Sequence, residues 1–374
     1  MSALPRLSGP ELEAAIRKFD LPGELEGFTE LRRGHIHDTY VSTWRSWERG
    51  GTTRRFLHQR MNDAVFEDIP ALMHNVSVVT RHLSKAAEKA DDASALDDNT
   101  AHLTALQLVR ATDGGDYVIA NDTPWRTYHF VEGTQSYDHP KDASMAHAAA
   151  CAFGDFQVRL SSLDPADLRV TIPNFFNSEA RLSQLDDACR RDPKGRKAEV
   201  QVELDLIGER REQASVMERA LRDRRMPPRV VHGDTKLNNV LFDEKRDVPR
   251  CIVDLDTCMP GYSLFDFGDL VRFTAATADE DERDLSQVTV DMELYAALRE
   301  GYLRHAHRFL NSFERDHMAF SARLVSLTLA MRFLADHILG DVYFKVSRPG
   351  QNLDRARVQI RLVEEMEKRF PSGD

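Results

Sequence analysis

Cysteine is scarce in this chain of 374 residues, which has only Cys151, Cys189, Cys251 and Cys258. They form no CxxC pair and no dense framework, so we expect free thiols in a reducing compartment. No apolar run approaches the ~20 residues that a membrane span needs. The first fifteen residues lack a basic stretch followed by an apolar one, so we expect no secretory signal. These absences predict a cytoplasmic protein that is not embedded in a membrane.

Positive charge is also in deficit. The chain has 50 Lys and Arg against 61 Asp and Glu, a net charge of −11. This balance argues against a nucleic-acid groove as the main binding surface. The familiar glycine-rich phosphate motifs are missing too, because neither GxGxxG nor GxxxxGK[ST] occurs. A locally basic pocket for a phosphate-bearing ligand remains compatible with these numbers.

The remaining composition is that of a globular protein, with 41% hydrophobic and 30% charged residues. Strand-like runs crowd into the first 130 residues around two helices, at 8–20 and 68–84. Helical patterns dominate afterwards, and strand signals return only in 229–256. This order predicts an α+β fold with a β-rich lobe over 1–130 and a larger helical lobe over 131–374.

One segment concentrates polar residues between two apolar runs: VVHGDTKLNNVLFD, residues 230–243. The motif CIVDLD follows after a short turn and reads as the second strand of a hairpin. A loop and a hairpin would then present Asp234, Asn239 and Asp254 at one point. Carboxylate and amide oxygens without His or Cys are ligands suited to Mg²⁺, so we expect a magnesium site here.

The spacing of these residues is that of phosphoryl transfer. An Asp, an Asn five residues later and a metal-binding Asp after a short hairpin make up the signature of kinases. Other interpretations stay open. Asp234 is also suited to stabilising a turn, His232 to bracing the loop, and Asp256 to binding metal, orienting a neighbour or capping the MPG segment.

The chain resembles the aminoglycoside phosphotransferase/choline kinase superfamily and, within it, the N-acetylhexosamine 1-kinases. The motif around Asp234 indicates only a small-molecule kinase, whereas the last two of the following segments indicate the sugar 1-kinases. The resemblance spans nearly the full length and lies in GHIHDTY (34–40), QRMN (59–62), FGDFQ (153–157), HGDTKLNNVLFD (232–243), IVDLDTCMPG (252–261), LFDFGDLVRF (264–273) and MRFLADHILGDVYF (331–344).

The resemblance implies a bilobal protein-kinase-like fold with ATP between the lobes. The γ-phosphate would go to the anomeric C1 hydroxyl of an N-acetylhexosamine. Asp234 would be the catalytic base, and Asn239 and Asp254 the metal ligands. Arg332 and Tyr343 would hold the sugar together with Asp234. An Arg offers a fork of donors and an aromatic face packs on a pyranose ring, which suits this role.

An ordinary structural role is the alternative to sugar binding for both Arg332 and Tyr343. Arg332 stands four residues before Asp336 on an expected helix, where the two would form a surface ion pair. Tyr343 would then be an ordinary aromatic residue of the core.

The nucleotide side departs from the protein-kinase pattern. Gln59 stands where those kinases carry a lysine, and the sugar 1-kinases share this Gln. Arg60 is adjacent but points to the opposite face of a strand, and the helix over 68–84 offers no Glu. The phosphate loop is expected over RRGHIHDTY, where His35 would reach a phosphate. We therefore expect His35 and Gln59 to contact the nucleotide.

A D-F-G string at 266–268 is not expected to be the metal-binding triplet, because Asp254 already has the correct spacing. Asp266 and Asp269 are expected to cap a helix and brace the catalytic loop instead.

Three further hypotheses remain. The H-x-H pair in GHIHD opens some metal-dependent hydrolase sites, but repeated βα units are missing. A catalytically silent nucleotide-binding protein would explain the missing lysine. An aminoglycoside or choline kinase would need an acidic or aromatic cage, for which DEDERD (279–284) is the candidate, although such a run is usually solvated. The expected partners are ATP and a free sugar, and the expected state is a monomer. No motif separates N-acetylglucosamine from N-acetylgalactosamine.

Overall fold

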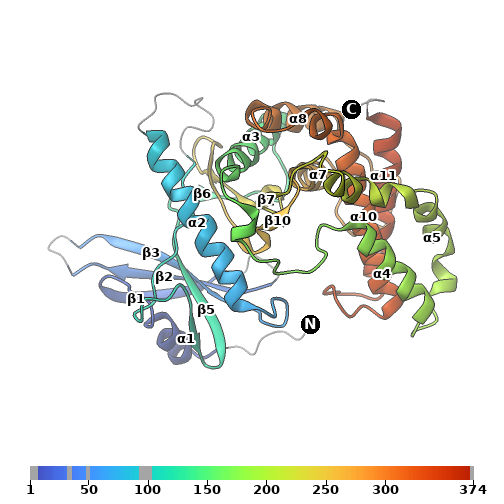
Figure 1. Ribbon diagram of the computed structural model, residues 1–374. Helices are drawn as coiled ribbons and strands as arrows, with labels where there is room; N and C mark the ends of the chain where they lie inside the picture. The colour runs from blue at the N-terminus through green and yellow to red at the C-terminus, as the bar shows by residue number, and fades with distance from the viewer. Residues whose placement is uncertain (1–6, 32–35, 48–50, 92–102, 371–374) are drawn as a thin grey trace.

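The computed structural model describes residues 7–31, 36–47, 51–91 and 103–370 and has two lobes (Figure 1). The smaller lobe is built on an antiparallel five-stranded sheet in the order β1-β2-β3-β5-β4. Its strands are β1 (Glu24–Glu30), β2 (Asp38–Arg45), β3 (Thr53–Arg60), β4 (Val118–Ala120) and β5 (Thr123–His129). The rest is mainly helical, so the predicted α+β arrangement is confirmed.

The two faces of this sheet have different neighbours. Phe56 of β3 packs with Trp44, Trp125 and the apolar side of α1 (Gly9–Ile16) in a small separate core. A capping box stands at the start of α1, since Ser8 N donates to a Glu11 carboxylate oxygen at 2.8 Å. The alternate residues of β3 face the larger lobe, which leaves the side chain of Gln59 on that side.

Helix α2 (Ile69–Asp91) joins the small lobe to the large one. Asp68 caps its first turn as predicted, accepting from Ala71 N at 2.8 Å. The helix runs well beyond the predicted end at residue 84. Its apolar side belongs to the main core of the protein, and Asn75 donates to the carbonyl of Cys258 at 3.0 Å. Helix α2 is therefore anchored on the segment that follows the second strand of the hairpin.

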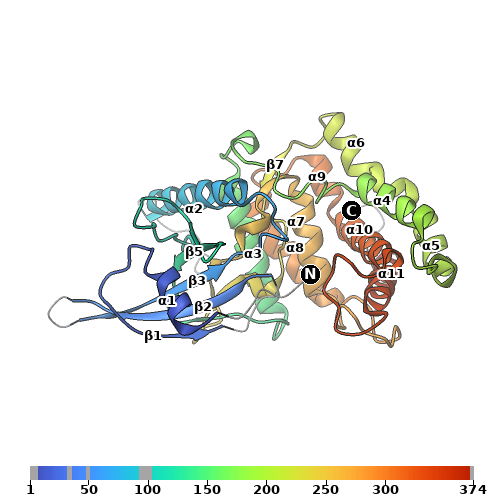
Figure 2. The same ribbon diagram turned by 90° about the horizontal axis from the view of Figure 1, so that it is seen from below.

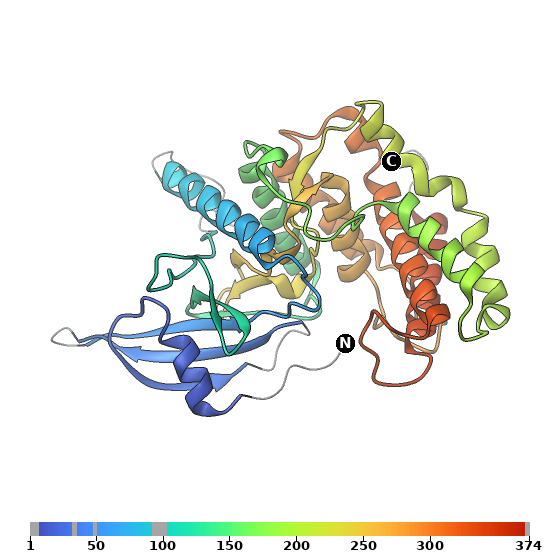
Figure 3. The ribbon, with the colours of Figure 1, turned by 60° about the horizontal axis from the view of Figure 1, so that its bottom comes forward.

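Two small sheets lie between the lobes and carry the motifs of the catalytic segment. The hairpin of β8 and β9 pairs with β6, and β7 pairs with β10. Figure 3 shows β7 to β10, in yellow, between the sheet with α2 on one side and the helices on the other. Their bounds are β6 (Thr134–Gln135), β7 (Arg229–Val231), β8 (Val240–Asp243), β9 (Pro249–Ile252) and β10 (Met259–Gly261).

The large lobe is organised around α10, which packs against α4, α7 and α11 (Figure 2). By length and composition α10 alone among the described helices is suited to crossing a membrane, but 78% of its apolar window is buried inside the protein. We therefore assign it as the central core helix. The main helices are α3 (Ala143–Leu160), α4 (Ser178–Arg191), α5 (Gln201–Gly208), α6 (Val216–Arg222), α7 (Ser263–Thr274), α8 (Met292–Ala306), α9 (Ser312–Asp316), α10 (Met318–Leu339) and α11 (Gln351–Arg369).

The alternating pattern of residues 105–112, ALQLVRAT, predicts a strand, but these residues form no full strand. They make isolated bridges, from Leu108 to β5 and from Ala111 to Phe19. Two backbone bonds still hold them along β5, since Val109 N donates to the Thr127 carbonyl at 2.8 Å and His129 N donates to the Gln107 carbonyl at 3.0 Å.

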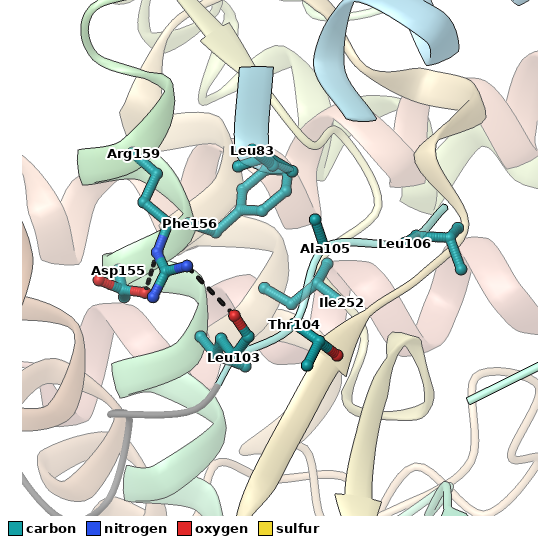
Figure 4. A pocket seen from close by; sticks show the side chains of 9 residues that line it. All are labelled: Leu83, Leu103, Thr104, Ala105, Leu106, Asp155, Phe156, Arg159 and Ile252. Atoms are coloured by element: carbon teal, nitrogen blue, oxygen red, sulfur yellow. Dashed lines mark hydrogen bonds and ion pairs between the residues drawn. The ribbon is translucent and has the colours of Figure 1, made fainter. Parts of the chain in front are cut away.

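Residues 103–106 form one wall of a small pocket behind the hairpin, shown in Figure 4. There Arg159 of α3 is paired with Asp155 at 2.6 Å and donates to the Leu103 carbonyl at 3.2 Å. Thr104 makes a bridge to β9. Residues 103 and 104 are thus fastened to α3 and to the hairpin.

Candidate active site

The loop from His232 to Asn239 is held by carboxylates from α7. Asp266 accepts from the backbone N–H groups of His232 and Gly233, both at 2.8 Å. Asp269 accepts from Thr235 N at 3.1 Å. The prediction that Asp266 and Asp269 brace this loop is therefore confirmed. The prediction that they cap a helix is wrong, because both lie within α7, whose N-cap is Tyr262.

Two further features fix the turn at the start of the loop. The His232 ring contacts the Val253 carbonyl at 3.0 Å and accepts from Asp234 N at 3.2 Å, which confirms its bracing role. Gly233 has a φ of +81°, and a Cβ there would lie 2.9 Å from Phe176 and from the Thr257 carbonyl. Only glycine suits this position, so the turn that aims Asp234 is set by the sequence itself.

Asp234 is placed between a cation and an amide. Its Oδ1 lies 2.9 Å from Lys236 Nζ, and its Oδ2 accepts from Asn239 Nδ2 at 3.1 Å. Burial opposes the charge, but Lys236 and the hydrogen bonds outweigh it, so the pKa of Asp234 is lowered. The carboxylate is thus ionised at neutral pH and remains partly exposed. Lys236 was missed by the sequence reasoning, although its place two residues after Asp234 was the available signal.

The hairpin brings Asn239 and Asp254 to the same place. Val253 N donates to the Asn239 carbonyl at 2.9 Å, directly before Asp254. Asp254 adopts φ +62°, a left-handed conformation that Asp tolerates better than most residues. Enclosure by protein, and then the charges of Asp256 and Asp234, raise the pKa of Asp254 to about 6. The Asp254 side chain is nevertheless exposed, so its carboxylate is open to solvent and to an incoming ion.

The donor set of this place fits a magnesium ion that keeps water and phosphate ligands. Within the described ranges, no three His, Cys, Asp or Glu side chains gather as a ready metal cage. Asp234 and Asp254 lie within electrostatic reach of each other. Asn239 uses its Nδ2 on Asp234, which leaves its Oδ1 available. The Asp254 carboxylate and the Asn239 amide oxygen are a partial shell, as Mg²⁺ usually has in phosphate-processing sites.

Asp256 has a different task from Asp254. Arg126 of β5 binds it with both terminal nitrogens, one at 2.9 Å from Oδ2. His37 Nε2 lies 2.5 Å from the same oxygen, and His37 Nδ1 accepts from Asn62 N at 3.0 Å. Because Nδ1 accepts, Nε2 carries the proton and donates to Asp256. With three donors on its carboxylate, Asp256 orients Arg126 and His37 and is not available as a metal ligand.

Gln59 lies beside this group. It pairs with Arg126 across β3 and β5, and its Oε1 accepts from Arg126 Nε at 2.9 Å. Arg60 is buried on the opposite face with Asp38 at 3.0 Å, as predicted. His35, the other expected nucleotide contact, lies outside the described residues.

Arg332 and Tyr343 lie together on the helical lobe. The Arg332 guanidinium lies 5.1 Å from the ring centroid of Phe175, 5.8 Å from that of Tyr343 and 5.2 Å from that of Phe344. Burial lowers its pKa, and Tyr343 partly offsets this. Tyr343 is 50% exposed, so the interpretation of Tyr343 as a core aromatic is wrong.

The alternative ion pair between Arg332 and Asp336 does not form. Asp336 is buried and accepts from the backbone N–H groups of residues 342, 343 and 344, at 2.9, 2.8 and 2.9 Å. It therefore shapes the turn that carries Tyr343. Figure 3 shows the loop after α10, in red, on the side of the helical lobe that faces the sheet.

A series of charges connects the two groups of residues. Lys236 lies within electrostatic reach of Asp269 and Glu280, and Arg272 lies within reach of both Asp234 and Arg332. Glu280 is bound by Arg272 at 3.1 Å and approached by Arg355 at 3.8 Å. The expectation of a solvated acidic run over 279–284 is thus wrong for Glu280, whose charge is compensated.

Solved structures with a similar fold are kinases of small molecules. An aminoglycoside phosphotransferase from Alicyclobacillus acidocaldarius superposes with a TM-score of 0.58 and 15% identity, over 98% of this chain and 97% of that one. A microcompartment-associated aminopropanol kinase gives 0.56 and 16%, over 96% and 98%. A choline kinase from Cryptosporidium parvum gives 0.52 and 13%, over 91% and 89%. At these identities the likeness shows a shared bilobal, protein-kinase-like fold.

The family assignment rests on the sequence itself. The profile of the phosphotransferase enzyme family matches residues 45–320, which include the sheet from the end of β2, the catalytic loop, the hairpin and α7. This match spans most of the chain, and the chain belongs to the phosphotransferase enzyme family.

Proposed function

We propose that this protein is an ATP-dependent kinase that phosphorylates the anomeric C1 hydroxyl of a free N-acetylhexosamine. The observation that carries the proposal is the meeting of Asp234, Asn239 and Asp254 at the end of the hairpin. Arg332 and Tyr343 of the helical lobe, together with Arg181 of α4, form what we call the acceptor wall. Phosphoryl transfer depends on positioning and charge neutralisation, and this arrangement offers both.

Asp234 is the group that orients the acceptor hydroxyl and takes its proton. Its ionised state and its bonds to Lys236 and Asn239 fix the carboxylate in place. Asn239 and Asp254 would hold Mg²⁺, which supplies positive charge to the phosphate oxygens. Lys236 adds a cation next to the place where the phosphoryl group and the hydroxyl meet. A general base of this kind contributes about 10²–10⁴-fold to the rate.

The charges on the acceptor side favour a neutral acceptor. Burial lowers the pKa of both Arg181 and Arg332, and the charge of Arg332 lowers that of Arg181 further. Among the described residues neither forms an ion pair with a carboxylate, and Arg181 donates to the Gln184 side chain at 2.8 Å. Two neighbouring guanidinium groups disfavour an aminoglycoside or a choline-like cation. They donate well to the carbonyl and hydroxyl oxygens of an N-acetylated sugar. The aromatic rings around Arg332 suit the apolar face of a pyranose.

A substrate panel tests the proposal. The purified protein is incubated with Mg-ATP and free N-acetylglucosamine, N-acetylgalactosamine, the plain hexoses, choline, aminopropanol and an aminoglycoside. Mass spectrometry identifies the phosphorylated acceptor, and phosphorus NMR with coupling to the anomeric proton gives the position. We expect a sugar 1-phosphate from an N-acetylhexosamine. Phosphorylation of the cationic acceptors alone would refute the sugar assignment.

A further inference from the structure

The amide of Gln59 has a defined orientation, although nothing in the strand itself requires one. A guanidinium group has only donors and no acceptor. The Gln59 atom 2.9 Å from Arg126 Nε must therefore be the carbonyl oxygen Oε1. The amide nitrogen Nε2 is then directed away from Arg126, with two N–H groups that no described residue accepts. Gln59 is also only partly buried, so this donor is accessible.

Arg126 is itself fixed from the opposite lobe. Its two terminal nitrogens bind the two oxygens of Asp256, and its Cζ lies 5.3 Å from the ring centroid of Tyr128. Both members of the ion pair are almost fully buried, at 1% and 3% exposure. A planar guanidinium held on one side by a carboxylate and on the other by an amide oxygen has no freedom to turn.

The contacts between Asp256, Arg126 and Gln59 lie next to the residues that would hold the metal. Asp256 lies two residues after Asp254, and Arg126 lies within electrostatic reach of Asp254. Gln59 occupies the face of β3 that is turned toward the larger lobe, in one row with Thr39 of β2 and Arg126 of β5. An amide donor on this row faces the space next to the residues that would hold Mg²⁺ and phosphate.

We propose that Asp256 and Arg126 are positioning residues that turn the Gln59 amide nitrogen toward the nucleotide phosphates. The inference rests on the proposed function, since it assigns a contact to the nucleotide. A lysine side chain would contact the phosphates directly. Here Asp256 orients Arg126, and Arg126 orients the Gln59 amide that makes the contact. The phosphate contact is then a neutral N–H donor, and the cation behind it remains paired with Asp256.

The decisive variant is Gln59→Glu. A carboxylate at this position still accepts from Arg126 Nε, and does so more strongly than an amide. It has no donor, however, and it places a negative charge where phosphate would lie. The dissociation constants of Mg-ADP and of adenosine are measured by calorimetry without any acceptor. We expect Gln59→Glu to weaken Mg-ADP at least tenfold and to change adenosine less than twofold.

Gln107→Glu is the matched control. It makes the same substitution in the same lobe at an exposed position, and we expect both ligands to bind as in the wild type. Arg126→Met, or Arg126→Lys if that variant does not fold, frees the amide to rotate. Either variant should weaken Mg-ADP severalfold with little change for adenosine, and thermal melting confirms that the variant is folded.

The outcomes separate the two proposals. A wild-type protein that binds neither ADP nor adenosine contradicts the proposed function. A wild type that binds both, with a Gln59→Glu variant of unchanged ADP affinity, overturns only the role of Gln59 as a donor. An equal loss for ADP and adenosine in Gln59→Glu also overturns it, because it would mark a structural role.

Discussion

The catalytic loop and the acceptor wall treat their charges in opposite ways. On the loop, Asp234 is paired with Lys236, and the backbone on either side is bound to Asp266 and Asp269. On the acceptor wall, Arg332 and Arg181 form no ion pair with a carboxylate within the part of the chain that the structure describes. Arg181 donates to Gln184 at 2.8 Å, and three aromatic rings surround Arg332. The loop is held by an ion pair and backbone bonds before any ligand arrives, whereas no carboxylate binds the guanidinium groups of the wall.

This difference indicates which kinetic constant depends on each region. A carboxylate fixed by several bonds has its geometry ready for the transition state, so changes there should act on kcat. Guanidinium groups that no carboxylate binds gain oxygen acceptors when the acceptor substrate binds, so changes there should act on KM.

The largest expected effect is on the loop. Asp234→Asn removes the base but keeps the size of the side chain, so we expect kcat to fall about 10²–10⁴-fold. Mg-ADP affinity should stay near that of the wild type, as measured by calorimetry. Asp223→Asn, at an exposed position after α6, is the control. A near-native kcat in Asp234→Asn would remove the base from the account.

The next effect concerns the metal. Asp254→Asn removes the carboxylate that, with Asn239, would hold Mg²⁺, so the Mg²⁺ concentration for half-maximal activity should rise at least ~10-fold. A titration of activity against Mg²⁺ at saturating nucleotide measures it. An unchanged titration would assign the metal to other ligands.

Substitutions on the acceptor wall should change the KM of the sugar. Arg332→Met keeps contact with the rings but removes the donors, each worth about 1.5–3 kcal/mol when charged. We expect the KM of the sugar to rise about 10- to 100-fold and that of ATP to stay within a factor of two. Arg323→Met is the control, because Arg323 lies on the same helix over the Phe320 ring. The reverse ranking of the two KM values would move the sugar site elsewhere.

The smallest effect on activity is expected at Glu218, a buried acid of α6. Burial raises the pKa of Glu218 to about 7, despite its bond to Ser178 N at 2.6 Å. The folded state therefore holds a proton that the unfolded state releases near pH 4.5. Stability falls as the pH rises from about 4.5 to about 7 and is constant above that range.

Glu218→Gln should abolish this loss. Its unfolding free energy should exceed that of the wild type on the order of 2 kcal/mol above pH 7, with no advantage below pH 4.5 and no change in kcat. Urea titrations at pH 5 and pH 8 measure the difference. An advantage that is equal at both pH values would show that the acid is not protonated in the fold.

The sequence predicted the local parts of the site well. Asp234 and Asn239 are five residues apart in one loop, and Asp254 follows through a short hairpin, so strand pairing leaves little freedom. The braces from Asp266 and Asp269 follow from one helix that begins shortly afterwards. Short connections carry this information because a turn and a hairpin fix their own geometry.

The remaining parts depend on long-range packing. Arg126 is separated from Gln59 by 67 residues and from Asp256 by 130, so neither contact produces a short sequence motif that predicts it. Residues 105–112 alternate like a strand, yet their backbone bonds to β5 are limited to residues 107–109, and the preceding residues 103 and 104 bind α3 and the hairpin. In both cases tertiary contacts, rather than the local sequence pattern, determine the structure.

The most direct test of the central claim is phosphorus NMR of the wild type and Asp234→Asn, each with Mg-ATP and an N-acetylhexosamine. We predict a new sugar 1-phosphate resonance, coupled to the anomeric proton, that grows with the wild type and is at least a hundredfold slower with the variant. Equal rates for the two proteins, or no phosphorylated product from any acceptor with the wild type, would contradict the account.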